Sequence, residues 1–284
     1  MKTKIVTRKS MIIRPSNRST DFISPSFINE CAYNCTYCYV KRHNAEYITI
    51  AKNTLDILNE INSHAYFSTV EKPNQTGKYI TYDIGCNSDI ALHAKQLEWK
   101  TIFSFFRNHP LAMGSFATKY VNKNLLKFNP DGKVRIRFSL MPQKYSSILE
   151  PGTSLIIDRI KAIDKFIAKG YEVHINFSPV IVTDTWLEDY RDLFMLVDEH
   201  VQNKDQVKSE VIFLTHNEKK HQFNLANNVP GEDMLWRPEI QESKISQYGG
   251  DNIRYQHELK RQFIHQFRSL HNIVIPWNTI RYIF

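Results

Sequence analysis

The segment Cys31-Ala-Tyr-Asn-Cys35-Thr-Tyr37-Cys38-Tyr39 dominates the sequence, because it holds three of the four cysteines in a chain of 284 residues. These cysteines are spaced C-x3-C-x2-C within eight residues. Cysteine thiolates are soft ligands, and closely spaced thiolates favour a compact site for a soft metal. The segment therefore predicts a metal centre held by Cys31, Cys35 and Cys38.

The number of cysteines indicates which kind of metal centre to expect. Three thiolates suit three corners of a cubane iron–sulfur cluster, which usually takes four, so one iron keeps an open coordination position. A structural zinc site, with His43 or Cys86 as the fourth ligand, is the alternative. Zinc sites more often use paired C-x2-C motifs, and the sequence has no second pair. We therefore expect a [4Fe-4S] cluster with one open iron.

The composition is that of a folded protein. Hydrophobic residues make up 42% and aromatic residues 12%, and only 9 glycines and 11 prolines argue against low complexity. The length fits one large domain, or a domain with a small appendage. The longest apolar runs are too short to span a membrane, and the N-terminus lacks the apolar stretch of a signal peptide. Clustered cysteines suit a reducing compartment, so we expect a cytoplasmic protein with no membrane partner.

The net charge is +8 and the isoelectric point is about 9.2. A basic surface attracts anionic partners such as nucleic acid through electrostatic steering and counterion release. Many basic proteins bind no nucleic acid, however, so the charge alone leaves both possibilities open.

Strand-like and helix-like segments alternate along much of the chain. The strand-like segments are 22–28, 79–84, 116–120, 134–140, 171–182 and 211–214, and the helix-like segments are 54–67, 90–107, 154–169, 185–201 and 255–271. This alternation favours parallel βα units, and six strands predict an α/β fold with a partial (βα)6 barrel. Loops after the strands of such barrels carry the chemistry, and Cys86, Lys119 and Ser139 lie at or near predicted strand ends.

The chain is expected to divide into three parts. Residues 1–22 form a basic lead-in, residues 23–215 form the barrel, and residues 216–284 form an extension that covers the substrate. The interval 216–254 is expected to be rich in loops. It contains Trp236-Arg237-Pro238 and Gln247-Tyr248-Gly249-Gly250, followed by Arg254-Tyr255. Their aromatic and arginine side chains suit a base and a phosphate, although ordinary loop packing explains them equally well.

The cysteine loop resembles the signature of the radical S-adenosylmethionine (radical SAM) enzymes, a family with a partial barrel fold. In that family the amino and carboxylate groups of SAM bind the open iron, and reductive cleavage gives a 5′-deoxyadenosyl radical. The resemblance implies that Tyr37 lies near the adenine. It also implies SAM and a [4Fe-4S] cluster as cofactors, and an electron donor such as flavodoxin or ferredoxin.

A longer stretch, from about residue 28 to residue 200, resembles the spore photoproduct lyase family. The resemblance rests on the cysteine loop and on four further segments, Cys86-Asn-Ser88-Asp89, Ala-Thr-Lys119, Arg135-Ile-Arg-Phe-Ser139 and Glu150-Pro-Gly-Thr-Ser154. It implies a lyase that repairs thymine dimers in ultraviolet-damaged DNA.

The resemblance also implies roles for individual side chains. Cys86 would donate hydrogen to the product radical, and Tyr37 and Tyr39 would return the radical so that SAM is regenerated. The side chains of Ser88, Lys119 and Ser139 would contact SAM. A thiol is a good hydrogen-atom donor, and a lysine and hydroxyls suit the carboxylate and ribose of SAM.

Plainer interpretations of these residues remain open. Cys86 would then be a small buried hydrophobe, Lys119 a strand lysine with its amine in solvent, Ser139 a partner for backbone groups, and Tyr39 a core residue. Two other functions are also compatible with the sequence. One is a radical SAM enzyme acting on a modified nucleoside, RNA or a small metabolite. The other is a non-catalytic nucleic-acid-binding protein stabilised by its metal.

Overall fold

The computed structural model describes residues 2–16, 19–40, 45–68, 77–245 and 250–284. The chain folds into two compact units. The first unit comprises Met1–Ala32, Ala45–Phe138 and Ala162–Ile175, and the second comprises Tyr33–Asn44, Ser139–Lys161 and Asn176–Phe284. Each unit contains strands and helices, which confirms the expected α/β class.

The largest sheet has eight strands in the order β14-β10-β9-β8-β7-β6-β3-β2. Its strands are β2 (Arg14–Pro15), β3 (Phe22–Ile23), β6 (Ile80–Asp83), β7 (Ala112–Thr118), β8 (Val134–Leu140), β9 (Glu172–Val180), β10 (Lys208–Phe213) and β14 (Thr279–Ile283). The pairs β3–β6, β6–β7, β7–β8 and β10–β14 are parallel, whereas β2–β3 is antiparallel. From β3 to β10, neighbours in the sheet follow one another in the chain, which is the strand order of the expected partial (βα)6 barrel.

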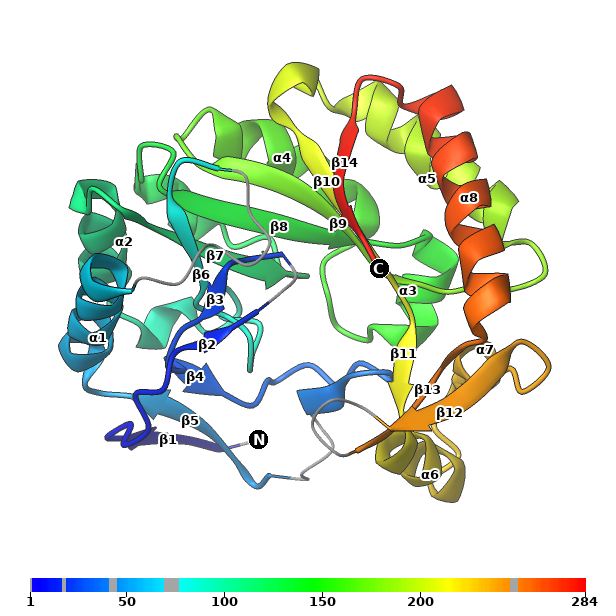
Figure 1. Ribbon diagram of the computed structural model, residues 1–284, viewed down its shortest axis with the longest axis horizontal. Coiled ribbons are helices and arrows are strands. Elements are labelled where there is room, and N and C mark those ends of the chain that lie inside the picture. The colour runs from blue at the N-terminus through cyan, green and yellow to red at the C-terminus, as the bar shows by residue number, and fades with distance from the viewer. Residues whose placement is uncertain (1, 17–18, 41–44, 69–76, 246–249) are drawn as a thin grey trace. The chain divides into compact units, whose positions relative to one another are not determined.

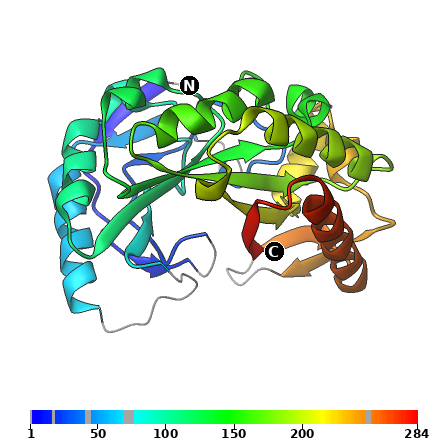
Figure 2. The same cartoon turned by 90° about the horizontal axis from the view of Figure 1, so that it is seen from above.

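Two helices of the first unit pack on its strands. α1 (Thr54–Phe67) and α2 (Trp99–Asn108) lie side by side in both views (Figures 1 and 2), and both contact β7. Their buried side chains are spaced for one apolar face on each helix. Gly114 of β7 allows the close approach of α2, because a Cβ at that position would lie 2.9 Å from the ring of Phe106.

A small sheet delivers the chain to the cysteine loop. β1 (Lys2–Val6) pairs in parallel with β5 (Tyr47–Ala51), and β5 pairs antiparallel with β4 (Ile28–Asn29), which ends two residues before Cys31. The segment 1–22, expected as an extended lead-in, therefore contains β1, β2 and the first residue of β3.

Aromatic packing dominates the second unit. α5 (Trp186–His200) and α8 (His257–Val274) lie side by side (Figure 1), with the ring centroids of Phe194 and Phe267 5.3 Å apart. Two shorter helices of the chain, α3 (Gln143–Leu149) and α4 (Ile156–Ile167), follow β8. Among the described ranges, no helix has the length and apolar character needed to cross a bilayer.

The interval expected to be rich in loops contains more regular structure than predicted. β11 (Thr215–Asn217), β13 (Asp251–Tyr255) and β12 (Gln241–Ile245) form an antiparallel sheet, and α6 (Glu218–Ala226) contacts β11 and β13 (Figure 1). The short helix α7 (Glu232–Leu235) follows α6. These elements are short and largely polar, so they carry little of the apolar periodicity on which the prediction depended.

The helix expected over 90–107 is also different, since α2 begins only at Trp99. Residues 90–98 form turns and a 3₁₀ segment, η2 (Ala94–Gln96). Side-chain contacts explain this conformation, because the Asn122 amide donates to the Ala91 carbonyl at 2.8 Å and the Asp89 carboxylate binds the end of β7. Two further 3₁₀ segments are η3 (Lys123–Lys127) and η4 (Lys204–Gln206).

Candidate active site

The cysteine loop has the donor set that the sequence predicts. Cys31 and Cys35 are buried and Cys38 is partly exposed, and none of the chain's four cysteines, all of which the structure describes, is in a disulfide. The Cys38 N–H donates to the Cys35 carbonyl at 3.0 Å, which closes a tight turn between these two cysteines. Thiols are the ligands that iron–sulfur clusters take, so the residues present fit a cluster.

Tyr37 of this loop is anchored within the second unit. Its hydroxyl donates a hydrogen bond to Glu150 Oε1, just beyond the C-terminal end of α3. Burial, followed by the negative charge of Glu150, raises the pKa of Tyr37 well above its ordinary value. The Tyr37 phenol therefore stays protonated at neutral pH. Tyr39 differs, because 44% of it is exposed.

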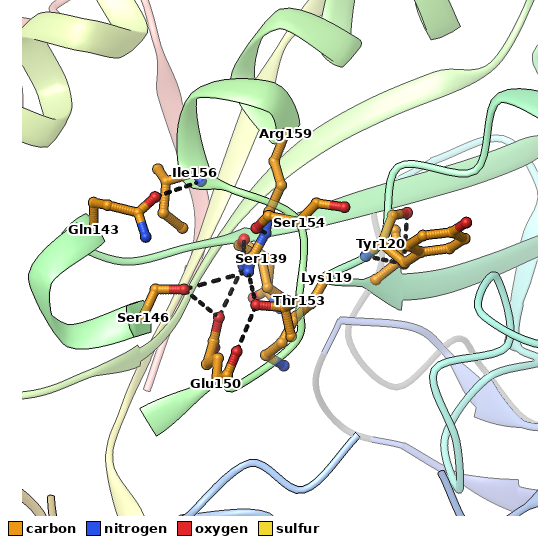
Figure 3. Close-up of polar contacts among 12 residues, drawn as sticks. Lys119, Tyr120, Ser139, Gln143, Ser146, Glu150, Thr153, Ser154, Ile156 and Arg159 are labelled. Atoms are coloured by element: carbon orange, nitrogen blue, oxygen red, sulfur yellow. Dashed lines mark hydrogen bonds and ion pairs between the residues drawn. The ribbon is translucent and has the colours of Figure 1, made fainter. Parts of the chain in front are cut away.

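Glu150, which accepts the hydrogen bond from Tyr37, also forms a buried ion pair. Arg159 Nη1 of α4 lies 2.9 Å from Glu150 Oε2, and both side chains are fully buried. Ser146 donates a further hydrogen bond to the same carboxylate oxygen at 3.0 Å, and Figure 3 shows this cluster. A buried charge is costly unless its hydrogen-bonding capacity is satisfied, so these contacts explain how Glu150 is tolerated there.

The same arginine reaches Ser139, one of the predicted SAM contacts. Arg159 Nη1 donates to the Ser139 carbonyl at 2.8 Å (Figure 3). Ser139 is the penultimate residue of β8 and is buried, and its hydroxyl accepts a hydrogen bond from the Asn176 amide at 3.4 Å. Through Glu150 and Arg159, the second unit therefore connects the aromatic residue of the cysteine loop to the end of β8.

The first unit contains the remaining candidates. Cys86 follows the last residue of β6 by three positions and is partly exposed. Ser88 is buried, and its hydroxyl has no hydrogen-bond partner within the part of the chain that the structure describes. A buried hydroxyl without a partner is costly, so a polar ligand group such as a hydroxyl or carboxylate of SAM fits this position.

Asp89 joins the Cys86 segment to Lys119. Its Oδ2 accepts a hydrogen bond from the main-chain N–H of Lys119 at 2.7 Å, and its Oδ1 accepts one from the Thr118 hydroxyl at 2.8 Å. Lys119 directly follows β7, so one carboxylate ties the loop after β6 to the end of β7. Within the first unit, the segment that contains Cys86 and Ser88 is thereby joined to the backbone at Lys119.

Ion pairs support the strands that lead to these residues. Arg137 of β8 pairs with Asp83 of β6 at 2.7 Å, and Arg135 of β8 pairs with Glu172 of β9 at 2.8 Å. The alternating pattern of residues 134–140 predicted a strand, which β8 confirms. Every residue of β8 is nevertheless buried, and these pairs compensate the charges of its two arginines.

The arginines that the sequence singled out in the C-terminal part are held in ion pairs. Arg237 pairs with Asp184 at 2.9 Å and with Glu239 at 2.5 Å, and Arg254 pairs with Glu242 at 3.2 Å. The predicted contacts at 247–249, and the alternative zinc ligand His43, lie outside the described residues.

The sequence did not predict the contribution of three residues to the site, Glu150, Asp89 and Arg159. Glu150 and Asp89 lie in segments that the sequence singled out, but their partners are distant along the chain. Arg159 occupies one position on a helix whose apolar spacing gave no reason to expect a buried charge. A signal was present, because Arg159 lies at helical spacing from the buried Ile156, Ile160 and Ile163, on the face of α4 that is otherwise apolar.

Comparisons with known proteins identify the family to which this chain is similar. A model of the family described as spore photoproduct lyase matches residues 2–284, so the likeness extends well beyond residues 28–200. Spore photoproduct lyase of Bacillus subtilis (strain 168) is 25% identical over 288 residues, covering 98% of this chain and 80% of that protein.

Solved structures of spore photoproduct lyase share the fold. A mutant with bound AdoMet and dinucleoside spore photoproduct has a TM-score of 0.87 and 19% identity, covering 99% of this chain and 82% of that chain. A lyase complexed with dinucleoside spore photoproduct has a TM-score of 0.86 and 20% identity, with the same coverage. The chain belongs to the spore photoproduct lyase family and is a radical SAM lyase whose cofactors are a [4Fe-4S] cluster and S-adenosylmethionine.

Proposed function

We propose that this chain repairs spore photoproduct, the thymine dimer of ultraviolet-irradiated spore DNA, by splitting it into two thymines. The observation that carries the proposal is the family match over residues 2–284 in a chain that also has a thiol, Cys86, at the end of a barrel strand. The dinucleoside spore photoproduct bound to the structural relatives supports the same class of substrate.

Cys31, Cys35 and Cys38 are proposed to hold the cluster. When bound, the cluster and SAM together supply the 5′-deoxyadenosyl radical. The protein contributes the position of the reactants and the exclusion of water. Burial of Cys31 and Cys35 supports that contribution, because it keeps water away from two of the three ligands.

Lys119, Ser88 and Ser139 are proposed to bind SAM. The lysine ammonium suits the carboxylate of SAM, and the two hydroxyls suit its ribose or its amino group. Support comes from the buried hydroxyl of Ser88, which a ligand atom would satisfy.

Cys86 is proposed to donate a hydrogen atom to the thymine radical that remains after the dimer splits. The donation breaks the S–H bond, forms a C–H bond and leaves a thiyl radical on Cys86. Tyr37 and Tyr39 are proposed to pass the radical back, so that SAM is regenerated. Partial exposure of Cys86 supports its role, because a hydrogen donor must be accessible to a substrate.

The partners and the location follow from the same chemistry. We propose that the substrate is damaged DNA, that flavodoxin or ferredoxin supplies the electron, and that the protein acts in the cytoplasm. The net charge of +8 supports an anionic substrate. The chain is further proposed to consist of a basic lead-in over residues 1–22, the barrel over residues 23–215 and an extension over residues 216–284 that covers the substrate.

The proposal is tested by anaerobic turnover of the reconstituted protein with SAM and dinucleoside spore photoproduct. The protein is expected to be brown, to lose its colour in oxygen and to contain about four irons and four sulfides, the content of one cubane cluster. Thymidine released from the dinucleoside and 5′-deoxyadenosine are measured by chromatography, and ultraviolet-irradiated DNA serves as the macromolecular substrate.

The control variants are Cys31→Ala, Cys35→Ala and Cys38→Ala, each of which should lose both the colour and the cleavage of SAM. If the wild-type protein cleaves SAM but releases no thymidine, the enzyme acts on another substrate. A colourless, zinc-loaded protein that binds DNA without turnover would instead identify a metal-stabilised binding protein.

A further inference from the structure

Thr36, which lies between Cys35 and Tyr37, is held by three hydrogen bonds. Thr36 is buried, its N–H donates to the Leu149 carbonyl at 2.9 Å, and its hydroxyl donates to the Pro230 carbonyl at 3.4 Å. Its own carbonyl accepts a hydrogen bond from the side-chain amide of Asn224 at 3.0 Å. Thr36 adjoins Cys35, so whatever holds Thr36 also fixes the backbone of the cysteine loop.

Asn224 belongs to a buried polar cluster with Glu232, His216 and His221. The Asn224 amide also donates to Glu232 Oε2 at 2.5 Å, so both of its N–H groups are used. His216 Nε2 lies 2.8 Å and His221 Nδ1 lies 2.6 Å from Glu232 Oε1. All four residues are buried, and they come from β11, α6 and the first residue of α7.

The charge state of this cluster follows from its geometry. Burial raises the pKa of Glu232, but hydrogen bonds from His216, His221 and Asn224 outweigh burial and lower it. An ionised carboxylate can only accept hydrogen bonds, so both imidazoles and the amide act as donors. The carboxylate thereby fixes the direction of the Asn224 amide, which leaves its second N–H pointing at Thr36.

We propose that the cluster of Asn224, Glu232, His216 and His221 is a positioning device that holds the cysteine loop through the Thr36 carbonyl. It acts on the iron–sulfur site through the backbone of the cysteine loop. Its role rests on the proposed function only in so far as the three cysteines bind a cluster.

The alternative is a metal site. One possible ligand atom from each of His216, His221 and Glu232 lies within 4.8 Å of the others, as binding of a divalent cation requires. The hydrogen bonds favour the first arrangement. A metal on His216 Nε2 would place the proton on Nδ1, which is buried and has no partner in the described ranges. Metal-bound imidazoles almost always donate their other N–H to an acceptor, so this histidine fits a hydrogen-bond donor better than a metal ligand.

Gly231 allows close packing of the backbone beside this cluster. Gly231 precedes α7 with a φ of +84°, and a Cβ there would lie 2.5 Å from Leu149 Cδ2. Glu232 therefore enters the cluster from a backbone that packs directly on the end of α3. The Leu149 carbonyl at that end is the acceptor for the Thr36 N–H.

The test compares two buried asparagines, Asn224 and Asn278. The amide of each donates to a main-chain carbonyl, and each has a second polar partner, Glu232 for Asn224 and His271 for Asn278. Asn224→Leu removes the contact with Thr36. Asn278→Leu is the matched control, because Asn278 is buried, donates to the Val207 carbonyl at 2.9 Å and pairs with His271 at 3.0 Å. Both variants lose a similar buried amide, but only the first loses a contact with the cysteine loop.

The reconstituted proteins are examined anaerobically without substrate. Iron transfer to a chelator is expected to be about five-fold faster in Asn224→Leu than in wild type, roughly the factor that one hydrogen bond is worth. The electron paramagnetic resonance spectrum of its reduced cluster should also change. Asn278→Leu should match wild type in both measurements, although both variants should lose thermal stability. If Asn224→Leu does not fold, Glu232→Gln takes its place.

Equal iron release and identical spectra in the Asn224 and Asn278 variants would overturn the proposal. One equivalent of zinc in the wild-type protein, lost in His216→Ala, would overturn it as well, in favour of a metal site. The proposed repair function fails separately, because a wild-type protein without lyase activity can still show the difference in iron release.

Discussion

The hydroxyl of Tyr37 donates a hydrogen bond to the carboxylate of Glu150, so the aromatic residue of the cysteine loop is tied to a buried ion pair. Tyr37→Phe removes this bond and the redox-active phenol together. We expect the cluster to assemble normally, whereas 5′-deoxyadenosine accumulates relative to released thymidine because SAM is no longer regenerated. Loss of one hydrogen bond to the charged group should lower stability by about 1.5–3 kcal/mol.

The ratio of the two products is measured by chromatography, with Tyr39→Phe as the comparison. Tyr39 is 44% exposed, so its substitution should change the ratio without the loss of stability. A wild-type ratio in both variants would remove the tyrosines from radical return.

Cys86→Ala should still cleave SAM and start the reaction, but the thymine radical should be quenched by other species and give aberrant products. Cys86→Ser tests the same point with a nearly isosteric side chain, because an alcohol O–H bond is a poor source of hydrogen atoms. Removing one small, partly exposed group should cost about 1 kcal/mol of stability. Product identity is measured by mass spectrometry, and normal thymidine from folded variants would eliminate the donor role.

Lys119→Ala and Ser139→Ala should weaken SAM binding by roughly ten-fold while the cluster stays assembled, since one hydrogen bond to a charged group is lost in each. Lys123→Ala is the matched control, because Lys123 is an exposed lysine on the neighbouring η3 segment. Affinity is measured anaerobically by equilibrium dialysis. Unchanged SAM binding in both test variants would show that these side chains do not contact SAM.

The Glu150–Arg159 pair should be strongly coupled. Glu150→Gln leaves the Arg159 charge without its partner and should cost about 3–5 kcal/mol, whereas Glu150→Gln with Arg159→Met should cost less than the sum of the single changes. Denaturant unfolding measures the free energies. Arg261→Met, at an exposed arginine 3.9 Å from Glu258, is the control and should cost less than about 1 kcal/mol. Additive effects at Glu150 and Arg159 would contradict the coupling.

Glu172 should make the free energy of unfolding depend on pH in the acidic range. Burial raises the pKa of Glu172, but the hydrogen bond from His174 and the charge of Arg135 lower it well below its ordinary value of 4.5. A lowered pKa means that this stabilisation is present above about pH 4.5 and is lost as the pH falls below it. The free energy of unfolding should therefore fall less steeply with acid in Glu172→Gln than in wild type. Glu188→Gln, at an exposed position on α5, is the control, and identical slopes in all three proteins would refute the assignment.

The sequence was informative where chemistry or periodicity is local. The cysteine loop was read from spacing alone, and β8 was predicted with its observed bounds because Val134, Ile136 and Phe138 alternate with polar residues. α4 followed in the same way from apolar spacing, and α5 from the capping-box pattern of Thr185 and Glu188. β14 was missed, because a five-residue edge strand after a proline and a tryptophan has little pattern of its own.

The supports of the site were less predictable because their partners are remote. Glu150 and Arg159 are a charged pair whose burial depends on the tertiary fold, and Asp89 gains its role only when β6 and β7 pair. Likewise, no pattern in the sequence links His216 and His221 to a carboxylate that begins a four-residue helix. Local propensities cannot report contacts that exist only in the folded chain.

The contact between Asn224 and the Thr36 carbonyl has a consequence for biosynthesis. Asn224 follows Thr36 by 188 residues in the chain. At about 5–20 residues per second, the ribosome makes the cysteines roughly 10–40 s before it makes the residue that anchors their loop. During that interval the three thiols are exposed to metals and oxidants without their support. Delivery of iron and sulfide is therefore best timed after translation ends, by a donor that recognises the finished fold rather than the nascent cysteines.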